Sequence, residues 1–125
     1  MARSRLLVID DEPAITALIR RTAEPCGYEV VETSETEAFK KQLGALKPKV
    51  ICLDLAMPGF DGIEILRFLA RRQCASQLLI ISGFDPVMVQ SALRLGEALG
   101  LNMAGTFSKP IDIVKLRRLL GELAG

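Results

Sequence analysis

The sequence predicts one α/β domain, an open, doubly wound sheet of five parallel strands with helices on both faces. Five short apolar segments recur along the 125 residues, and each is followed by a segment with apolar residues at helical spacing. Strands separated by helices pair in parallel through right-handed crossovers, which places helices on both faces of the sheet. A chain of this length holds one domain of ordinary size, so we expect residues 1–125 to form a single domain.

The strands are predicted from short apolar runs, which are typical of strands buried on both faces of a sheet. They are residues 6–9, 28–31, 50–53, 78–81 and, more weakly, 103–107. The carboxyl ends of parallel strands meet at one edge of the sheet, and we expect the functional residues there.

The helices are predicted from their start signals and their apolar stripes. Pro13 stands at the first position of the first helix, and Ser34 and Glu37 form a capping-box pattern for the second. The third helix runs from about residue 61 to residue 72, and Asp85 caps the fourth. The last helix carries four leucines on one stripe, namely Leu116, Leu119, Leu120 and Leu123.

The composition excludes several classes of function. Lys and Arg number 16 and Asp and Glu 15, and this near balance argues against a nucleic-acid-binding surface. The absence of histidine excludes Ser-His-Asp and Cys-His catalysis and most zinc sites. The three cysteines have no paired spacing, so we expect reduced thiols in a cytoplasmic protein. Near the N-terminus the apolar run 6–9 is too short for a signal peptide or a membrane span, so we expect no membrane association.

Polar residues follow four of the predicted strands and should meet at one edge of the sheet. Asp10 and Asp11 follow the first strand, Asp54 the third, Ser82 the fourth and Lys109 the fifth. Carboxylates about 4 Å apart repel each other by roughly 1 to 4 kcal/mol per pair, so this cluster needs a cation or raised pKa values. Oxygen ligands without histidine or thiolate favour Mg²⁺.

These residue types together favour phosphoryl binding. Mg²⁺ could take a phosphoryl oxygen as a ligand, and a strand-end aspartate can act as the nucleophile to give an aspartyl phosphate. Each residue also has a simpler interpretation. Asp10 and Asp11 could cap a helix, Asp54 could be a loop residue and Lys109 a surface charge. The joint pattern is more specific, because each group follows a different buried strand.

Five sequence blocks together resemble the receiver domain of two-component response regulators. The blocks are residues 7–13 (LVIDDEP), 53–58 (LDLAMP), 61–62 (DG), 80–83 (IISG) and 108–110 (SKP), and their order and spacing match. The resemblance covers essentially the whole chain and implies a flavodoxin-like (βα)5 fold with strand order 2-1-3-4-5. It also implies a regulatory phosphoacceptor domain that is not an enzyme beyond its own phosphorylation and dephosphorylation.

The resemblance implies roles for the residues that match. Asp54 would be the phosphoacceptor. Asp11 would bind Mg²⁺ directly and Asp10 largely through water, with Asp54 and the backbone carbonyl of Ala56 as the remaining protein ligands. The resemblance also implies a phosphohistidine donor. Because the chain has no histidine, this donor would lie on a partner, either a sensor histidine kinase or a histidine phosphotransfer protein.

Two further matching residues would hold the phosphoryl group. Ser82 would donate a hydrogen bond to it and Lys109 would pair with its charge. The peptide bond between Lys109 and Pro110 is expected to be cis. Phosphorylation would then switch the surface formed by the fourth helix, the last strand and the last helix.

One position departs from the pattern. Thr106 stands three residues before Lys109, where many receivers carry Tyr or Phe as the aromatic half of the switch. Strand alternation points Phe107 to the opposite face, into the core. Phe84 could shield the acyl phosphate or anchor its loop. Thr106 and Phe84 are therefore the candidate switch residues.

The sequence leaves the setting of this domain open. It could stand alone, form a homodimer, or belong to a longer regulator. Residues 99–110 resemble, more weakly, receivers fused to EAL-type cyclic-di-GMP phosphodiesterases. A Mg²⁺-dependent phosphohydrolase is a rival function, but it would carry a second acid where this chain has Ala56. A degenerate receiver that acts only as an interaction module would lack acceptor or metal residues, and here all are present.

Overall fold

The computed structural model describes residues 3–59, 61–83 and 85–124, which form five strands and five α-helices in strict alternation. The strands are β1 (Ser4–Ile9), β2 (Tyr28–Thr33), β3 (Val50–Asp54), β4 (Gln77–Ser82) and β5 (Asn102–Ser108). The helices are α1 (Pro13–Ala23), α2 (Thr36–Leu46), α3 (Gly62–Arg71), α4 (Pro86–Ala98) and α5 (Ile113–Ala124), with a short 3₁₀ turn at Glu24–Cys26 after α1. No helix in these ranges is long and apolar enough to cross a membrane.

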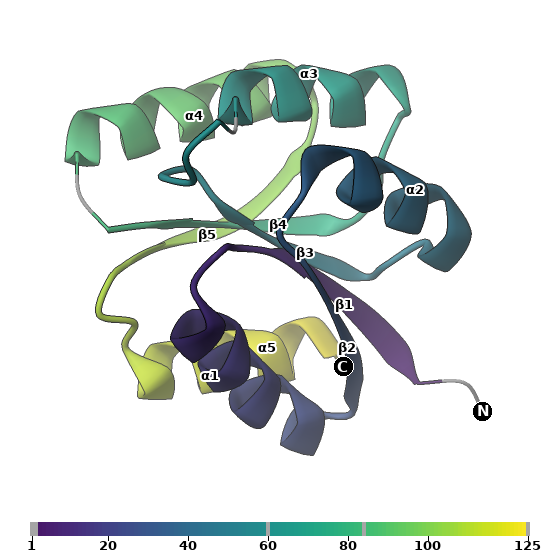
Figure 1. The fold of residues 1–125 in the computed structure, drawn as a ribbon, viewed down its shortest axis with the longest axis vertical. Coiled ribbons are helices and arrows are strands. Elements are labelled where there is room, and N and C mark those ends of the chain that lie inside the picture. Colours follow the sequence, from purple (N-terminus) through teal and green to yellow (C-terminus); the bar gives the residue numbers. More distant parts are fainter. Residues whose placement is uncertain (1–2, 60, 84, 125) are drawn as a thin grey trace.

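The sheet has the order β2-β1-β3-β4-β5, and all its neighbouring strands are parallel (Figure 1). Helices α2, α3 and α4 cover one face and α1 and α5 the other. Each face has its own apolar cluster. One joins the sheet to Phe39, Leu43, Ile65 and Leu66, and the other joins it to Ile19, Leu116 and Leu120. The predicted doubly wound fold and its strand order are confirmed.

Most of the predicted helix starts are confirmed. Pro13 is the first residue of α1, and the Asp85 carboxylate accepts hydrogen bonds from two backbone N–H groups at the start of α4. The capping box at Ser34 is wrong, because α2 begins at Thr36 and its N-cap residue makes no side-chain hydrogen bond. The Thr33 hydroxyl accepts a hydrogen bond from the Glu35 N–H instead, so the chain is still turning at that point.

Strand β5 contains a bulge. Leu78 pairs with Met103 and Leu79 with Gly105, so Ala104 is an extra residue on β5. Phe107 is only 3% exposed and lies in the apolar cluster beneath α1 and α5, as strand alternation predicted. Met103 lies on the other face, against α4. A Cβ atom added at Gly96 of α4 would stand 2.4 Å from the Met103 sulfur, so any larger residue at position 96 would require the Met103 side chain to move.

Candidate functional site

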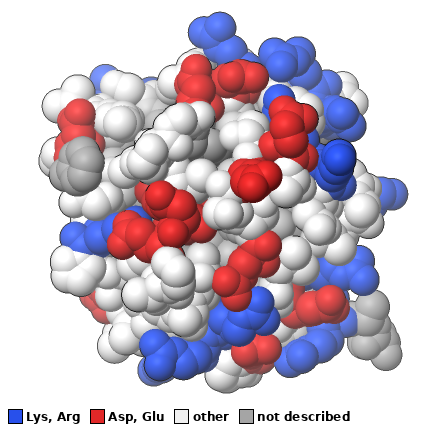
Figure 2. Space-filling view, viewed as in Figure 1, with Lys and Arg blue, Asp and Glu red and all other residues white. Residues whose placement is uncertain are grey.

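Four acidic residues meet where β1 and β3 end. Asp10, Asp11 and Glu12 follow β1, and Asp54 is the last residue of β3. One carboxylate oxygen of each lies within 4.8 Å of those of the others. Figure 2, drawn in the orientation of Figure 1, shows acidic side chains gathered on the left, where the carboxyl ends of the strands lie between the two helix layers. The prediction that the strand-end carboxylates converge is confirmed.

The backbone fixes both buried carboxylates. Oδ1 of Asp10 accepts a hydrogen bond from the Glu12 N–H at 2.8 Å, and Oδ1 of Asp54 accepts one from the Ala56 N–H at 2.9 Å. Asp10 is 4% exposed and Asp54 2% exposed. In each case the other carboxylate oxygen, Oδ2, makes no hydrogen bond to the backbone of the described residues and faces the cluster.

Lys109 supplies the cation of the cluster. Its Nζ lies 3.2 Å from Oδ2 of Asp54 and 3.5 Å from Oδ2 of Asp10, and it also donates to Oε1 of Glu12. Partial burial lowers the pKa of Lys109, but the hydrogen bond to Glu12 and the charges of Asp10 and Asp54 leave it raised. The Lys109 N–H donates to the carbonyl of Ser82 at 2.9 Å, and the bond to Pro110 is cis, as predicted.

The surroundings of Asp10 fit a divalent cation. Burial raises the pKa of the Asp10 carboxyl from 3.8 to about 6, and the charge of Asp54 adds to the rise. Its Oδ2 atom is buried and has no hydrogen-bond partner among the described residues, although Lys109 stands nearby. An oxygen-only donor set with an unpartnered buried carboxylate oxygen is the kind of site that Mg²⁺ occupies.

This burial predicts a pH dependence of stability in metal-free buffer. The folded state holds a proton on Asp10 up to about pH 6, whereas the unfolded chain releases it near pH 4, so the free energy of unfolding should fall as pH rises through this window. The shift corresponds to at most about 3 kcal/mol. Urea denaturation in EDTA from pH 4 to 7 should show this fall, and Asp10→Asn should remove it. Lys109, Asp54, Asp11 and Glu12 face Asp10 in both proteins, so the two variants differ only in the Asp10 carboxyl and its effect on these neighbours. Identical pH profiles would contradict the prediction.

The other predicted site residues lie at or near this edge. Ser82 is the last residue of β4, is 2% exposed, and pairs with Ser108 of β5. Asp11 is exposed beside the buried Asp10. Thr106 is half-buried opposite Ile80, and its carbonyl accepts a hydrogen bond from the Lys115 side chain. The prediction for Phe84 lies outside the described residues.

Sequence reasoning missed the contact between Glu12 and Lys109. The run of three acids from Asp10 to Glu12 was a signal for it. The exposed Glu12 side chain must nevertheless reach across from the end of β1 to the residue after β5, and only the folded sheet brings those ends together.

A family profile described as "Response regulator receiver domain" matches residues 6–120. This match and the site described above define a class of protein, and the chain belongs to the family of response regulator receiver domains. These domains act in two-component signalling, and the chain shares that role.

Solved structures and curated proteins agree with this assignment. A response regulator from Colwellia psychrerythraea is 34% identical, with a TM-score of 0.83 and coverage of 98% of both chains. A protein-glutamate methylesterase/protein-glutamine glutaminase of Myxococcus xanthus is 34% identical over 95% of this chain and 34% of its own length. The cyclic di-GMP phosphodiesterase RocR of Pseudomonas aeruginosa is 29% identical over 92% of this chain and 30% of its own length. The chain thus spans about a third of the length of these two curated relatives.

Proposed function

We propose that the chain is a working phosphoacceptor in which Asp54 takes a phosphoryl group from a phosphohistidine of a partner protein. The N–P bond of the donor breaks, an Asp54 carboxylate oxygen forms the new O–P bond, and the imidazole leaves. The observation that carries this proposal is the environment of Asp54. Its carboxylate is buried and held through Oδ1, and its Oδ2 points at Lys109 inside the acidic cluster.

Asp10, Asp11, Asp54 and the backbone carbonyl of Ala56 would hold Mg²⁺. The ion would offset the repulsion between the carboxylates and the negative charge of the incoming phosphoryl group. The protein's own groups do the remaining work. The Ala56 N–H orients Asp54, Lys109 neutralises the transferred charge, and Ser82 donates a hydrogen bond to a phosphoryl oxygen.

The partners and setting follow from the same proposal. We infer a sensor histidine kinase or a histidine phosphotransfer protein as the donor. Residues 1–125 would form one receiver unit in the cytoplasm, where the three free cysteines stay reduced, with no activity beyond phosphorylation and dephosphorylation of its own residue. An output domain of the phosphodiesterase type is supported by the similarity to RocR, whereas other relatives are transcriptional regulators or methylesterases.

The proposed phosphorylation is tested by intact mass after incubation with a small acyl-phosphate donor. One phosphoryl group should be added when Mg²⁺ is present and almost none in EDTA, and peptide mapping should locate it on Asp54. Hydroxylamine should remove it, because it is an acyl phosphate. The absence of any adduct would favour the degenerate receiver. Continuous release of phosphate from small phosphate esters would favour the phosphohydrolase.

Phosphorylation should also change the α4-β5-α5 surface. Ser82 ends β4 and Lys109 directly follows β5, and a backbone hydrogen bond joins them. A phosphoryl group that attracts both should therefore move the start of α4 and the end of β5. Thr106 is too small to act by ring rotation. With beryllofluoride as the phosphoryl mimic, we expect large amide NMR shifts in α4, β5 and α5. Shifts confined to the neighbours of Asp54 would contradict this switch, and Asp54→Asn serves as the control that should not respond.

A further inference from the structure

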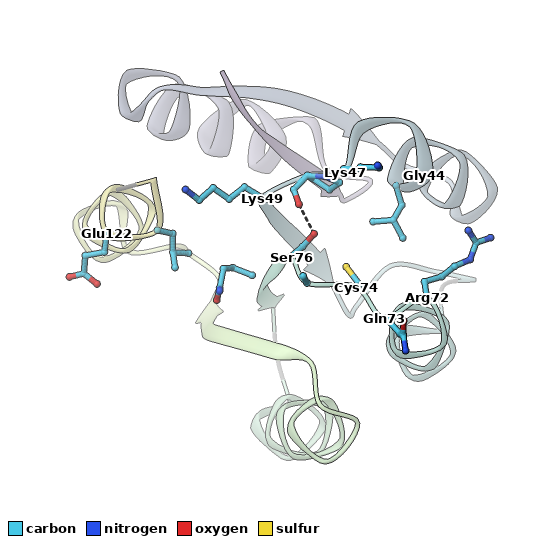
Figure 3. A pocket seen from close by; sticks show the side chains of 13 residues that line it. Gly44, Lys47, Lys49, Arg72, Gln73, Cys74, Ser76 and Glu122 are labelled. Carbon is cyan, nitrogen blue, oxygen red and sulfur yellow. Dashed lines mark hydrogen bonds between the residues drawn. The ribbon is translucent and has the colours of Figure 1, made fainter. Parts of the chain in front are cut away.

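A cavity of about 700 Å³ lies at the opposite end of the sheet from Asp54 (Figure 3). Its walls are the segment between α2 and β3, the segment between α3 and β4, and the last turn of α5. Asp54 stands at the far end of β3, five residues along the strand, or roughly 15 Å away. The phosphoryl chemistry therefore makes no use of this cavity.

The walls are held together by hydrogen bonds, so the cavity exists before any ligand arrives. The Ser76 hydroxyl donates to the carbonyl of Pro48, which is the dashed line in Figure 3, and the Gln77 N–H donates to the carbonyl of Lys49 at 2.8 Å. The Asn102 side chain donates to the carbonyl of Ala75 at 3.0 Å. Three hydrogen bonds, two of them donated by residues of β4 and β5, thus fix the two loops, and binding would cost little ordering of the protein backbone.

Positive charge surrounds this cavity. Lys47, Lys49 and Arg72 line it, and within the described ranges none of the three forms an ion pair with a carboxylate. Glu122 is the one acidic side chain among the lining residues, and Figure 3 shows its carboxylate pointing outward from α5, away from the other labelled side chains. In Figure 2, Lys and Arg lie along the upper, right-hand and lower edges, and some also lie beside the acidic side chains on the left.

The rest of the lining is apolar or neutral. Leu43, Pro48, Ala75 and Leu123 supply apolar surface, and Gln73 and Ser76 supply neutral polar groups. Ligand pockets commonly have volumes of roughly 300 to 1,000 Å³ with this mixture of apolar walls and a few polar groups. Lys47 and Arg72 lie on the same side of the cavity in Figure 3, whereas the Lys49 ammonium turns toward α5 and donates to the carbonyl of Ala124 at 3.2 Å. An arginine guanidinium with a lysine on its side of the cavity suits a phosphate, because the guanidinium can bind two oxygens at once.

We propose that this cavity is a second ligand site, which binds a small phosphate ester with an apolar body. The phosphate would lie between Lys47 and Arg72, and the apolar body would contact Leu43, Ala75 and Leu123. The site does not depend on phosphorylation of Asp54, so the two proposals succeed or fail separately.

The test uses 1-naphthyl phosphate, with 1-naphthol and inorganic phosphate as matched ligands that lack the charge or the apolar body. Titration of the whole chain, followed by amide NMR, should give saturable shifts in residues 43–49, 72–77 and 122–123. The matched ligands should bind about tenfold more weakly or less, because each loses one half of the contacts. Shifts centred on another region, or equal binding of 1-naphthol, would overturn the proposal.

Two variants test the charges. Arg72→Gln removes the guanidinium, and Lys47→Asn removes an ammonium while keeping a residue that tolerates the left-handed backbone at this position, where φ is +47°. Each should weaken binding of 1-naphthyl phosphate by about tenfold. Arg21→Gln, on the exposed side of α1, is the matched control and should bind as the unchanged chain does. Equal affinity in all three variants would overturn the proposal.

The cysteines give a second readout in the same sample. Cys74 is half-buried and lines the cavity, with its sulfur turned toward the space between Ser76 and Gly44 in Figure 3. Cys26 is also half-buried but contacts carbonyls of α1 and α5 elsewhere. Bound 1-naphthyl phosphate should slow alkylation of Cys74 by iodoacetamide and leave Cys26 unchanged, as measured by peptide mass spectrometry. Equal rates with and without ligand would count against the site.

Discussion

Asp54→Asn should abolish the phosphoryl adduct formed with a small acyl-phosphate donor while leaving the fold intact. The amide retains an oxygen that can accept the hydrogen bond from the Ala56 N–H, so the local turn is preserved. It lacks the second carboxylate oxygen that faces Lys109, and an amide is a far weaker nucleophile than a carboxylate. Intact mass before and after incubation measures the result.

Asp61→Asn is the matched control for this variant. Asp61 is an exposed acid that caps α3 and lies outside the acidic cluster, and asparagine caps helices equally well. The control should take up one phosphoryl group like the unchanged chain. A persistent adduct on Asp54→Asn would mean that another residue is the acceptor, whereas loss of the adduct in both variants would point to damage to the fold.

Lys109→Met should lower the free energy of unfolding by about 3 kcal/mol at pH 7.5 in EDTA, since it leaves two buried carboxylates without their cation. The Asp10 side chain is fully buried and that of Asp54 is 2% exposed, so water cannot replace the ammonium. Mg²⁺ should restore much of the loss, because it binds only the folded state. Urea denaturation with and without MgCl₂ measures both effects.

Lys115→Met separates this effect from the general cost of removing a lysine. Lys115 donates to the carbonyl of Thr106 and lies over the Phe107 ring, but it faces no buried carboxylate. Its replacement should cost less than about 1 kcal/mol, with or without Mg²⁺. If Lys109→Met were as stable as Lys115→Met in EDTA, Lys109 would not be the group that neutralises the cluster.

The sequence was most informative where parallel topology alone decides position. Asp10, Asp54 and Lys109 follow buried strands, and a parallel sheet brings such ends to one edge whatever the loops do. Phe107 could likewise be assigned to the core by alternation, because the bulge at Ala104 lies before it on β5.

Features that depend on contacts between distant loops could not be predicted. The basic cavity exists because the segments after α2 and α3 meet the end of α5. None of these three segments has a sequence pattern that indicates this contact. The contact between Glu12 and Lys109 likewise joins segments that are far apart in the sequence, so no local pattern predicts it. The start of α2 was misplaced for a local reason, because the Thr33 hydroxyl binds the backbone at a position where the sequence suggested a cap by Ser34.

The close contact of Gly96 with Met103 is one of the points that hold α4 against the sheet, and it lies near the end of the helix. Gly96 lies in the last turn of the helix, and its carbonyl is also tied by the Leu101 N–H at 2.9 Å. The opposite end begins at Pro86, where Asp85 caps the backbone but the Val87 side chain is 74% exposed. The helix is about 15 Å long from Pro86 to Gly96, so a tilt of only about 10° about Gly96 would move the first turn by about 3 Å. A small displacement beside Ser82 would thus move the first turn of α4 farther than it moves the residues around Gly96.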